Sequence, residues 1–279
     1  MSWTPAVIVT DIDGTLLDEH ERIPAATSVA LSRAIAAGAE LIVATGRPPR
    51  WIGPTLAQLP YQHGTNGPDF TEPPRIMPKA VCANGALVYD AGTDTILHKH
   101  VLNPQVLRTI TRIVADILPH AGFAVERPGA NVRDPEHELY VVTEEYAPTW
   151  DSDSHGVEPL SALVRMPATK LLARAADMDS SKMHALVAPH IPADVAQVTY
   201  SMDEGLLEFS APGISKASGL QELGVDPDEV LAFGDMPNDN AMLEWAHVSV
   251  AMPNAHPSTV DAADEQGTIA DVLDRYFPS

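Results

Sequence analysis

Cysteine is almost absent from this sequence, since Cys82 is the only one in 279 residues. A single cysteine cannot form an internal disulfide, and a chain without disulfides suits a reducing cytoplasm. No stretch approaches the ~18 uninterrupted apolar residues that would suggest a membrane helix. The N-terminal segment MSWTPAVIVT also lacks a basic region followed by an apolar core, the pattern of a secretory signal. The sequence therefore predicts a soluble, cytoplasmic protein.

Basic residues are scarce as well: 17 Lys+Arg stand against 38 Asp+Glu, for a formal net charge of −21. Such a surface repels nucleic-acid backbones and anionic membranes, so neither is expected as a partner. It also repels a phosphorylated substrate at long range. A site for an anion must therefore supply positive charge locally, from a metal ion and a few selected cations.

Several short motifs are missing too. The sequence contains no H-E-x-x-H, no P-loop and no G-x-G-x-x-G, so a zinc protease, a nucleotide triphosphatase and a dinucleotide-binding protein lack support. His98 and His100 alternate on one expected strand and could together bind a metal, with exposed histidines as the alternative. Cys82 lies in an apolar run, which indicates a small buried side chain.

The sequence does contain apolar runs rich in β-branched residues, most of which stop abruptly at a polar residue. Continuous apolar runs of this length are typical of strands that are covered on both faces of a parallel sheet. Helical patterns lie between them, and this alternation predicts a doubly wound α/β core. The expected strands are 6–10, 40–44, 80–83, 230–234 and 247–251, and the expected helices are 24–38, 215–223, 238–246 and 268–277.

The middle of the chain has a different pattern. Residues 84–211 carry seven further strand candidates, some adjacent as in a hairpin, and only two helical patterns. One helix, over 103–118, has an apolar face, Asn103 as N-cap and a proline in its first turn. A second helix is expected at 181–187. We therefore predict a catalytic core from residues 1–83 and 212–279, with 84–211 inserted as an α+β cap domain over one end of the core sheet.

The strongest chemical signal is DIDGTLLD, directly after the first strand. Side chains alternate in an extended segment, so Asp11 and Asp13 project to the same side, and Gly14 then allows a sharp turn. Two neighbouring carboxylates at the end of a buried strand repel each other and lose solvation. They are tolerable with a cation or a shared proton. A polar strand end followed by a turn glycine is the simpler alternative.

Two further signals could hold an anion. In ATGRP, the hydroxyl of Thr45 and the backbone N–H groups around Gly46 follow the second core strand and could bind phosphate oxygens. In APGISKASGL, Lys216 begins a helix, where the macrodipole disfavours a cation unless an anion lies beside it. The alternatives are an ordinary strand-to-helix turn and a solvated surface lysine.

The last signal is GDMPNDNAML. Asp235 ends an apolar strand, and Asn238 and Asp239 open the next helix, where Asn238 could simply be the N-cap. All four signals nevertheless follow strands of one predicted sheet. Because ligands of open α/β sheets bind beyond the carboxyl ends of the strands, these polar groups are expected to form one site.

DIDGTLL, ATGR, the lysine of GISK and GDMPND occur in the same order as the four motifs of the haloacid dehalogenase-like (HAD) phosphatases, which this sequence resembles. CANGALVYD, which opens the insert, is similar to the Cof-type subclass with its large α/β cap. The resemblance covers nearly the whole chain. Two departures concern substrate choice: segment 60–79 is unusually long and rich in proline and glycine, and Ala217 follows the lysine where the subclass often has glycine.

The resemblance implies a magnesium-dependent phosphatase. Asp11 would attack phosphorus, and Asp13 would protonate the leaving oxygen and then activate water on the aspartyl-phosphate. Mg²⁺ would be held by the carboxylates of Asp11 and Asp235 and by the backbone carbonyl of Asp13, a set typical of this ion.

The remaining motif residues are expected to surround the phosphoryl group. Thr45, Gly46, Lys216 and Asn238 would bind it and offset its charge. Asp239 would orient Lys216 or a metal-bound water. The substrate would be a small phosphorylated metabolite, such as a sugar phosphate, enclosed by the cap. Candidate substrate contacts near the hinge are Arg47, Asn84 and Gly85.

Other functions stay open at this point. A sugar phosphomutase could use the same aspartyl-phosphate chemistry and would differ only in the fate of the phosphoryl group. A serine hydrolase could use Ser215, because GISKA is one residue short of G-x-S-x-G. A non-enzymatic binding protein would be expected to have lost a catalytic carboxylate, and none is missing.

Overall fold

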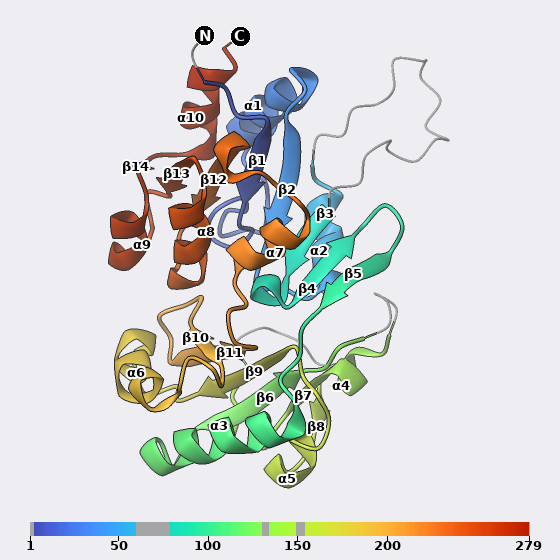
Figure 1. Cartoon of the computed structure of the whole chain (residues 1–279), viewed down its shortest axis with the longest axis vertical. Helices are drawn as coiled ribbons and strands as arrows, with labels where there is room; N and C mark the ends of the chain where they lie inside the picture. The colour runs from blue at the N-terminus through green and yellow to red at the C-terminus, as the bar shows by residue number, and fades with distance from the viewer. Residues whose placement is uncertain (1–2, 60–78, 130–133, 149–153, 279) are drawn as a thin grey trace.

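Two β-sheets organise the protein, one in the upper half and one in the lower half of Figure 1. The structure is a computed structural model that describes residues 3–59, 79–129, 134–148 and 154–278. The unusual segment 60–79 therefore lies outside the described residues, except for Lys79. Both chain ends lie in the upper half, so the lower half is built from the middle of the sequence.

The upper sheet has eight strands, and the five predicted core strands form its centre. The order is β14-β13-β12-β1-β2-β3-β4-β5, parallel as far as β3 and antiparallel beyond it. The observed bounds lie within one residue of the predicted ones. In sheet order the strands are β14 (Glu265–Gln266), β13 (Val248–Ala251), β12 (Val230–Gly234), β1 (Val7–Thr10), β2 (Glu40–Ala44), β3 (Lys79–Cys82), β4 (Leu87–Asp90) and β5 (Thr95–Lys99).

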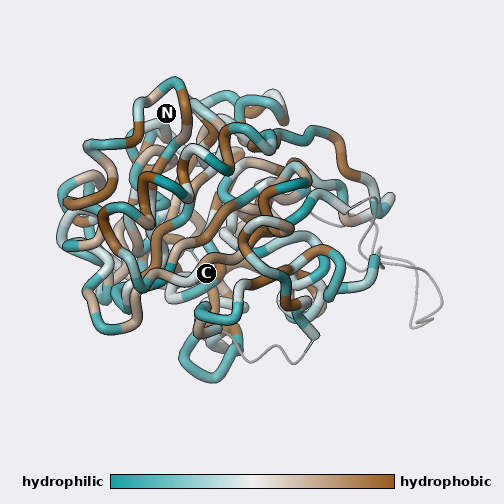
Figure 2. Tube along the Cα trace, turned by 90° about the horizontal axis from the view of Figure 1, so that it is seen from below, coloured by the Kyte–Doolittle hydropathy of each residue, from teal (hydrophilic) through white to brown (hydrophobic). Residues whose placement is uncertain are grey.

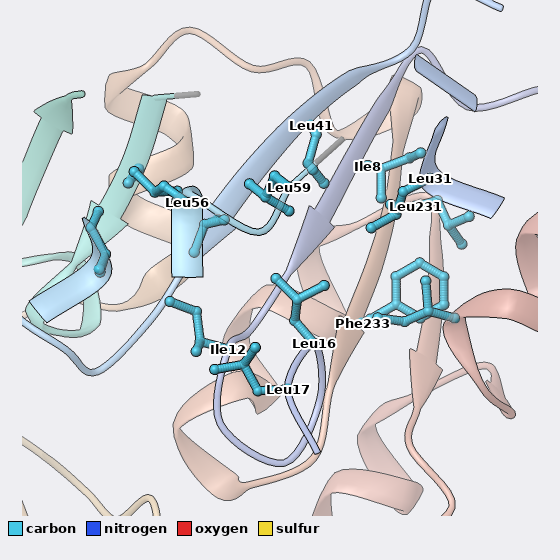
Figure 3. Packing of buried hydrophobic residues seen from close by; sticks show 14 of the residues in the cluster. Ile8, Ile12, Leu16, Leu17, Leu31, Leu41, Leu56, Leu59, Leu231 and Phe233 are labelled. Atoms are coloured by element: carbon cyan, nitrogen blue, oxygen red, sulfur yellow. The ribbon is translucent and has the colours of Figure 1, made fainter. Parts of the chain in front are cut away.

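Helices cover both faces of this sheet, which confirms the doubly wound α/β fold. Successive residues of β1 point to opposite faces, so that Ile8 joins one buried cluster while Val7 and Val9 join another. Figure 3 shows part of the first cluster, including Leu31 and Phe233. Its helices are α1 (Ala25–Ala36), α2 (Pro49–Leu56) and α10 (Ile269–Tyr276); α7 (Lys216–Glu222) and α8 (Asn240–Trp245) cover the second face, and α9 (Pro257–Ala262) packs against α8 and β13.

The lower sheet has six strands in the order β10-β11-β9-β6-β7-β8, all antiparallel except β7 and β8. Its α3 is the helix predicted at 103–118, and the side chain of Asn103 caps it by accepting from the N–H groups of Gln105 and Val106. The elements are β6 (Gly122–Glu126), β7 (Tyr140–Val142), β8 (Gly156–Val157), β9 (Lys170–Arg174), β10 (Gln197–Thr199), β11 (Leu206–Ser210), α3 (Pro104–Ile117), α4 (Glu136–Leu139), α5 (Leu160–Leu163) and α6 (Ser180–Val187).

The hairpin of β4 and β5 falls in the predicted insert but extends the upper sheet by pairing with β3. This pairing satisfies backbone groups that β3 would otherwise expose as an edge. The upper sheet therefore reaches Lys99, whereas the lower sheet lies wholly between residues 122 and 210. The division at residue 84 stays a prediction. We use "cap" for the lower sheet with α3 to α6, and "core" for the upper sheet with its helices.

Short 3₁₀ turns complete the described chain at η1 (Ala83–Gly85), η2 (Ala188–His190), η3 (Pro227–Glu229) and η4 (Pro237–Asp239). Figure 2 shows hydrophobic stretches concentrated along inner segments and hydrophilic stretches along outer loops. Among the residues described, every helix is too short or too polar to cross a membrane.

Candidate active site

Polar side chains gather at the carboxyl ends of three adjacent core strands. Asp11 follows β1 and Asp235 follows β12, and the N–H of Asp11 donates to the carbonyl of Phe233 at 3.1 Å. Thr45 follows β2, on the other side of β1. All three of these polar residues are buried. The structure thus brings together, at one rim, residues that lie more than 200 positions apart in the sequence.

Lys216 joins this group from the first residue of α7, and its side chain is completely buried. Its Nζ donates to Oδ1 of Asp11 at 2.7 Å and to Oδ1 of Asp239 at 2.5 Å. Burial lowers the pKa of Lys216, but the charges of Asp11 and Asp239 outweigh that effect and raise it overall. The ammonium therefore stays charged, and a solvated surface lysine is the wrong description.

Three buried carboxylates lie close enough to share one cation. Asp11, Asp235 and Asp239 each offer an oxygen within 4.8 Å of the others. Burial, followed by repulsion from Asp239, raises the pKa of Asp235 to about 7, and burial also raises the pKa of Asp11. When all three carboxylates are ionised, the ammonium of Lys216 offsets one of their charges and leaves two. A divalent cation would balance that charge, so the donor set fits the expected metal.

Asp239 is already committed to protein partners. While its Oδ1 accepts from Lys216, its Oδ2 accepts from the backbone N–H groups of Asp235 and Met236 at 3.0 and 3.1 Å. One oxygen of Asp239 therefore contacts Lys216, and the role of Asp239 in orienting this lysine stays a prediction.

Asp13 lies at the mouth of the site, and 53% of its side chain is exposed. Arg47 holds it in a forked ion pair, with Nε donating to Oδ2 at 3.0 Å and Nη2 to Oδ1 at 2.5 Å. Nη2 of Arg47 also contacts Glu21 at 3.2 Å. Arg47, expected as a substrate contact, therefore fixes the direction of the Asp13 carboxylate in this structure.

The loop after β2 presents the groups expected to bind phosphate. The hydroxyl of Thr45 accepts from the N–H of Arg47 at 3.0 Å and keeps its own proton to donate. Asn238 lies within η4, so it is not a helix N-cap, and its Nδ2 donates to Oδ1 of Asn84 at 3.2 Å. Within the described part of the chain, the buried Oδ1 of Asn238 has no hydrogen-bond partner.

A cavity of about 480 Å³ lies between this rim and the cap. Core residues line one side of it and cap residues the other. From the core come Asp11, Asp13, Gly46, Arg47, Arg50, Trp51 and Asn238; from the cap come Glu126, Tyr140, Lys170, Leu172, Ser201, Met202 and Glu208.

Residues 8–271 match the sequence model of the haloacid dehalogenase-like hydrolases. The chain belongs to this family. Over its length it is also similar to individual members. It is 26% identical over 282 residues to the phosphoglycolate phosphatase of Methanoculleus marisnigri, covering 97% of this chain and 96% of that protein.

Two more similar proteins carry phosphatase names. The 5-amino-6-(5-phospho-D-ribitylamino)uracil phosphatase YitU of Bacillus subtilis is 26% identical over 291 residues, with 99% of both chains covered. The solved structure of the HAD subclass IIB sugar phosphatase BT4131 has a TM-score of 0.70 and 19% identity, covering 95% of this chain and 94% of that one. The fold is therefore that of HAD proteins with a cap, and this HAD-family chain is a phosphoric monoester hydrolase.

Two residues of this HAD site were missed in the sequence. The hydroxyl of Thr15 donates to Oδ1 of Asp235 at 2.9 Å, and Nδ2 of Asn254 contacts Oδ2 of Asp235 at 3.2 Å and the carbonyl of Gly14 at 3.1 Å. Thr15 belongs to DIDGT, and Asn254 follows the strand β13. The signal that could have found Asn254 is its position just beyond the carboxyl end of a core strand.

Other candidates have structural roles in the described part of the chain. A Cβ on Gly85 would lie 2.0 Å from the carbonyl oxygen of Ser215, so the glycine permits close packing on α7. Ser215 itself caps α7, since its hydroxyl accepts from the N–H of Ser218. His98 and His100, predicted as cap residues, lie at the β5 edge of the core sheet. Nε2 of His100 lies 2.6 Å from Glu222, and His98 is 4.0 Å from the same carboxylate.

Gly14 provides a test of how tightly this site is packed. It adopts φ +73°, and a Cβ there would lie 2.2 Å from Oδ2 of Asp235. We expect Gly14→Ala to displace Asp235 and lower kcat/KM by about 100-fold or more, because a 1 Å misplacement in an active site has effects of that order.

Gly38 provides the matched control. It also has a positive φ, +102°, but a Cβ there would meet nothing within 4 Å. Gly38→Ala should lower the free energy of unfolding by about 1–3 kcal/mol through backbone strain and leave kcat/KM near the wild-type value. Steady-state kinetics and chemical denaturation of both variants check this. Equal losses of activity in the two variants would contradict the packing argument.

Proposed function

We propose that this HAD hydrolase is a magnesium-dependent phosphatase that cleaves phosphate monoesters of small hydroxylated metabolites through an aspartyl-phosphate on Asp11. One observation carries the proposal. The buried carboxylate of Asp11 is held by Lys216 at the floor of a cavity, beside Asp235 and the Thr45 loop. A carboxylate fixed at an enclosed cavity is suited to act as a nucleophile once the ammonium of Lys216 and a bound cation offset the effect of burial, which raises its pKa.

In the first step, an oxygen of Asp11 forms a bond to phosphorus and the bond from phosphorus to the ester oxygen breaks. Asp13 would leave its ion pair with Arg47, take up a proton, and give that proton to the leaving oxygen. In the second step, Asp13 takes a proton from water, whose oxygen attacks phosphorus, and the Asp11–phosphorus bond breaks to release phosphate. Lys216 holds Oδ1 of Asp11 in both steps, and Asp239 holds Lys216.

The phosphoryl oxygens would be bound by Thr45, the backbone around Gly46, and Asn238. Mg²⁺, held by the carboxylates of Asp11 and Asp235 and the Asp13 backbone carbonyl, would supply charge neutralisation of the phosphoryl group.

The rest of the cavity indicates the kind of leaving group. The carboxylates of Glu126, paired with Arg50, and of Glu208, paired with Lys170, keep lone pairs that can accept hydrogen bonds from hydroxyl groups. The cavity is also lined by the apolar surfaces of Trp51, Tyr140 and Leu172. The rings of Trp51 and Tyr140 pack edge to face with centroids 5.7 Å apart. A sugar or polyol phosphate, with hydroxyls on one side and an apolar face on the other, suits these walls. The names of YitU and BT4131 refer to esters of this kind.

A screen of phosphorylated metabolites with Mg²⁺ tests the function. We expect release of inorganic phosphate, with kcat/KM highest for sugar or polyol phosphates that fit a cavity of about 480 Å³. Conversion of one sugar phosphate into its isomer, without phosphate release, would instead assign the chain as a phosphomutase. Absence of either product across the panel would contradict the proposal.

A further inference from the structure

The face of the cap sheet that meets the core carries three buried charged residues. Glu126, Lys170 and Glu208 lie on the neighbouring strands β6, β9 and β11, where Glu126 is paired in register with Lys170. All three line the cavity above Asp11. Charges are costly to bury on a sheet unless partners compensate them, so their contacts indicate what this surface does.

Lys170 reaches from the cap to the phosphate-binding loop of the core. Its Nζ donates to the carbonyl of Gly46 at 2.7 Å and to Oε2 of Glu208 at 2.9 Å. Glu208 is fixed in turn, because it accepts from Nδ2 of Asn84 at 2.5 Å and from the hydroxyl of Ser201. Glu208 therefore positions the ammonium of Lys170, and Asn84 of the core holds Glu208.

The surroundings of Gly46 show what lies within reach of this ammonium. A Cβ on Gly46 would lie 3.6 Å from Nζ of Lys170 and 3.9 Å from Nδ2 of Asn238. Lys170 and Asn238 thus flank the same spot beside the loop. An ammonium has three N–H donors, and Gly46 and Glu208 take two of them. The third can serve an oxygen in the cavity that Lys170 lines.

We propose that Lys170 is a ligand of the substrate's phosphoryl group supplied by the cap, and that Glu208 is the residue that positions it. This inference rests on the proposed function. Lys170 would be a second lysine near the phosphoryl group, besides Lys216. It reaches the group only while the cap lies against the core. Turnover then requires the closed arrangement, because an open cap withdraws the cation.

Three variants test the proposal. Lys170→Gln should lower kcat/KM by about 10- to 100-fold, the effect of losing a hydrogen bond to a charged group. The loss should be the same for p-nitrophenyl phosphate and for a sugar phosphate, because both share the phosphoryl group. Lys170→Arg should recover most of the activity. Lys182→Gln, an exposed lysine on α6, is the control and should match the wild type.

The double variant Lys170→Gln with Glu208→Gln covers the case in which Lys170→Gln alone does not fold. It replaces the ion pair with a neutral pair and leaves no unpaired carboxylate. Because Glu208 acts on the phosphoryl group through Lys170, the double variant should lose no more activity toward p-nitrophenyl phosphate, which has no sugar hydroxyls, than Lys170→Gln, so the two effects are not additive. The single variant Glu208→Gln completes this comparison. A loss in the double variant equal to the product of the losses in Lys170→Gln and Glu208→Gln would show that Glu208 does not act through Lys170.

Calorimetric binding of inorganic phosphate, with Mg²⁺ present, separates this inference from the proposed function. Phosphate affinity should fall by about 10- to 100-fold in the double variant and stay unchanged in Lys182→Gln. Unchanged phosphate affinity in the double variant would overturn the role of Lys170 even if the wild type is an active phosphatase. So would a loss of kcat/KM in Lys170→Gln that is confined to sugar phosphates. A wild-type protein that binds phosphate through Lys170 but hydrolyses no ester would instead refute the proposed function.

Discussion

Asp11→Asn is expected to abolish turnover while leaving the protein folded. The amide has nearly the same shape as the carboxylate but cannot form the bond to phosphorus, so kcat should fall on the order of 10⁴-fold or more. Lys216 would keep Asp239 as its partner, which preserves the buried ion pair. Phosphate release is the measurement, with thermal unfolding as the check on folding.

Asp18→Asn is the matched control for this variant. Asp18 belongs to the same DIDGTLLD segment but is exposed, and it accepts from the backbone N–H groups of His20 and Arg22. Its amide variant should keep kcat within about twofold of the wild type, because exposed surface substitutions have small effects. Steady-state turnover by Asp11→Asn above a trace would assign the nucleophile elsewhere.

The second large effect is expected on removal of divalent cations. EDTA should lower kcat on the order of 10³-fold, since several kcal/mol of charge stabilisation are lost, and excess Mg²⁺ should restore it. Asp235→Asn should raise the Mg²⁺ concentration needed for half-maximal activity. Asp194→Asn, which changes an exposed carboxylate of the cap, should leave that concentration unchanged. Full activity in EDTA would remove the metal from the scheme.

The pH dependence of this metal requirement follows from Asp235. Burial and the charge of Asp239 raise its pKa to about 7. Below that pH the metal-free carboxyl holds a proton that the cation must displace, whereas above it the carboxylate is free to bind. The half-maximal Mg²⁺ concentration should therefore rise as pH falls below 7, by up to about tenfold per pH unit. A pH-independent requirement between pH 5 and 8 would contradict this assignment.

The core and most of its site could be predicted because local signals coincide there. The runs that became β1, β2 and β12 are apolar apart from Thr10 and Glu40, and they stop at Asp11, Thr45 and Asp235. Burial on both faces of a parallel sheet produces such runs, and the carboxyl ends of the strands must meet at one rim. The position of Lys216 was also informative. The macrodipole at a helix start disfavours a lysine, so Lys216 indicated that an anion lies nearby.

The features that sequence patterns did not reveal depend on contacts between distant segments. Helix α2 was not among the expected helices. Pro49 lies in its first turn, where proline is tolerated, whereas Pro54 lies inside the helix, where proline is unfavourable. The sequences of β4 and β5 predict two strands but do not indicate which sheet the hairpin joins. Its place was decided by the free edge of β3.

Single polar residues were the hardest to assign. Lys170 appears in KLLARAA as one charged residue at the start of an apolar strand, and its partner Glu208 lies 38 positions away. Thr15 and Asn254 contact Asp235 across 220 and 19 positions. No periodicity links such pairs, because only the packing of the cap on the core or the turn geometry brings them together.

The most direct test of the account is to trap the phosphoryl-enzyme. Asp13→Asn should still react with p-nitrophenyl phosphate, whose leaving group needs little protonation, but it lacks the base that activates water in the second step. Acid quenching followed by peptide mass spectrometry should then find one phosphoryl group on Asp11, and none when Asp11→Asn is added. A phosphoryl group on another residue, or phosphate release with no trapped adduct, would contradict covalent catalysis by Asp11.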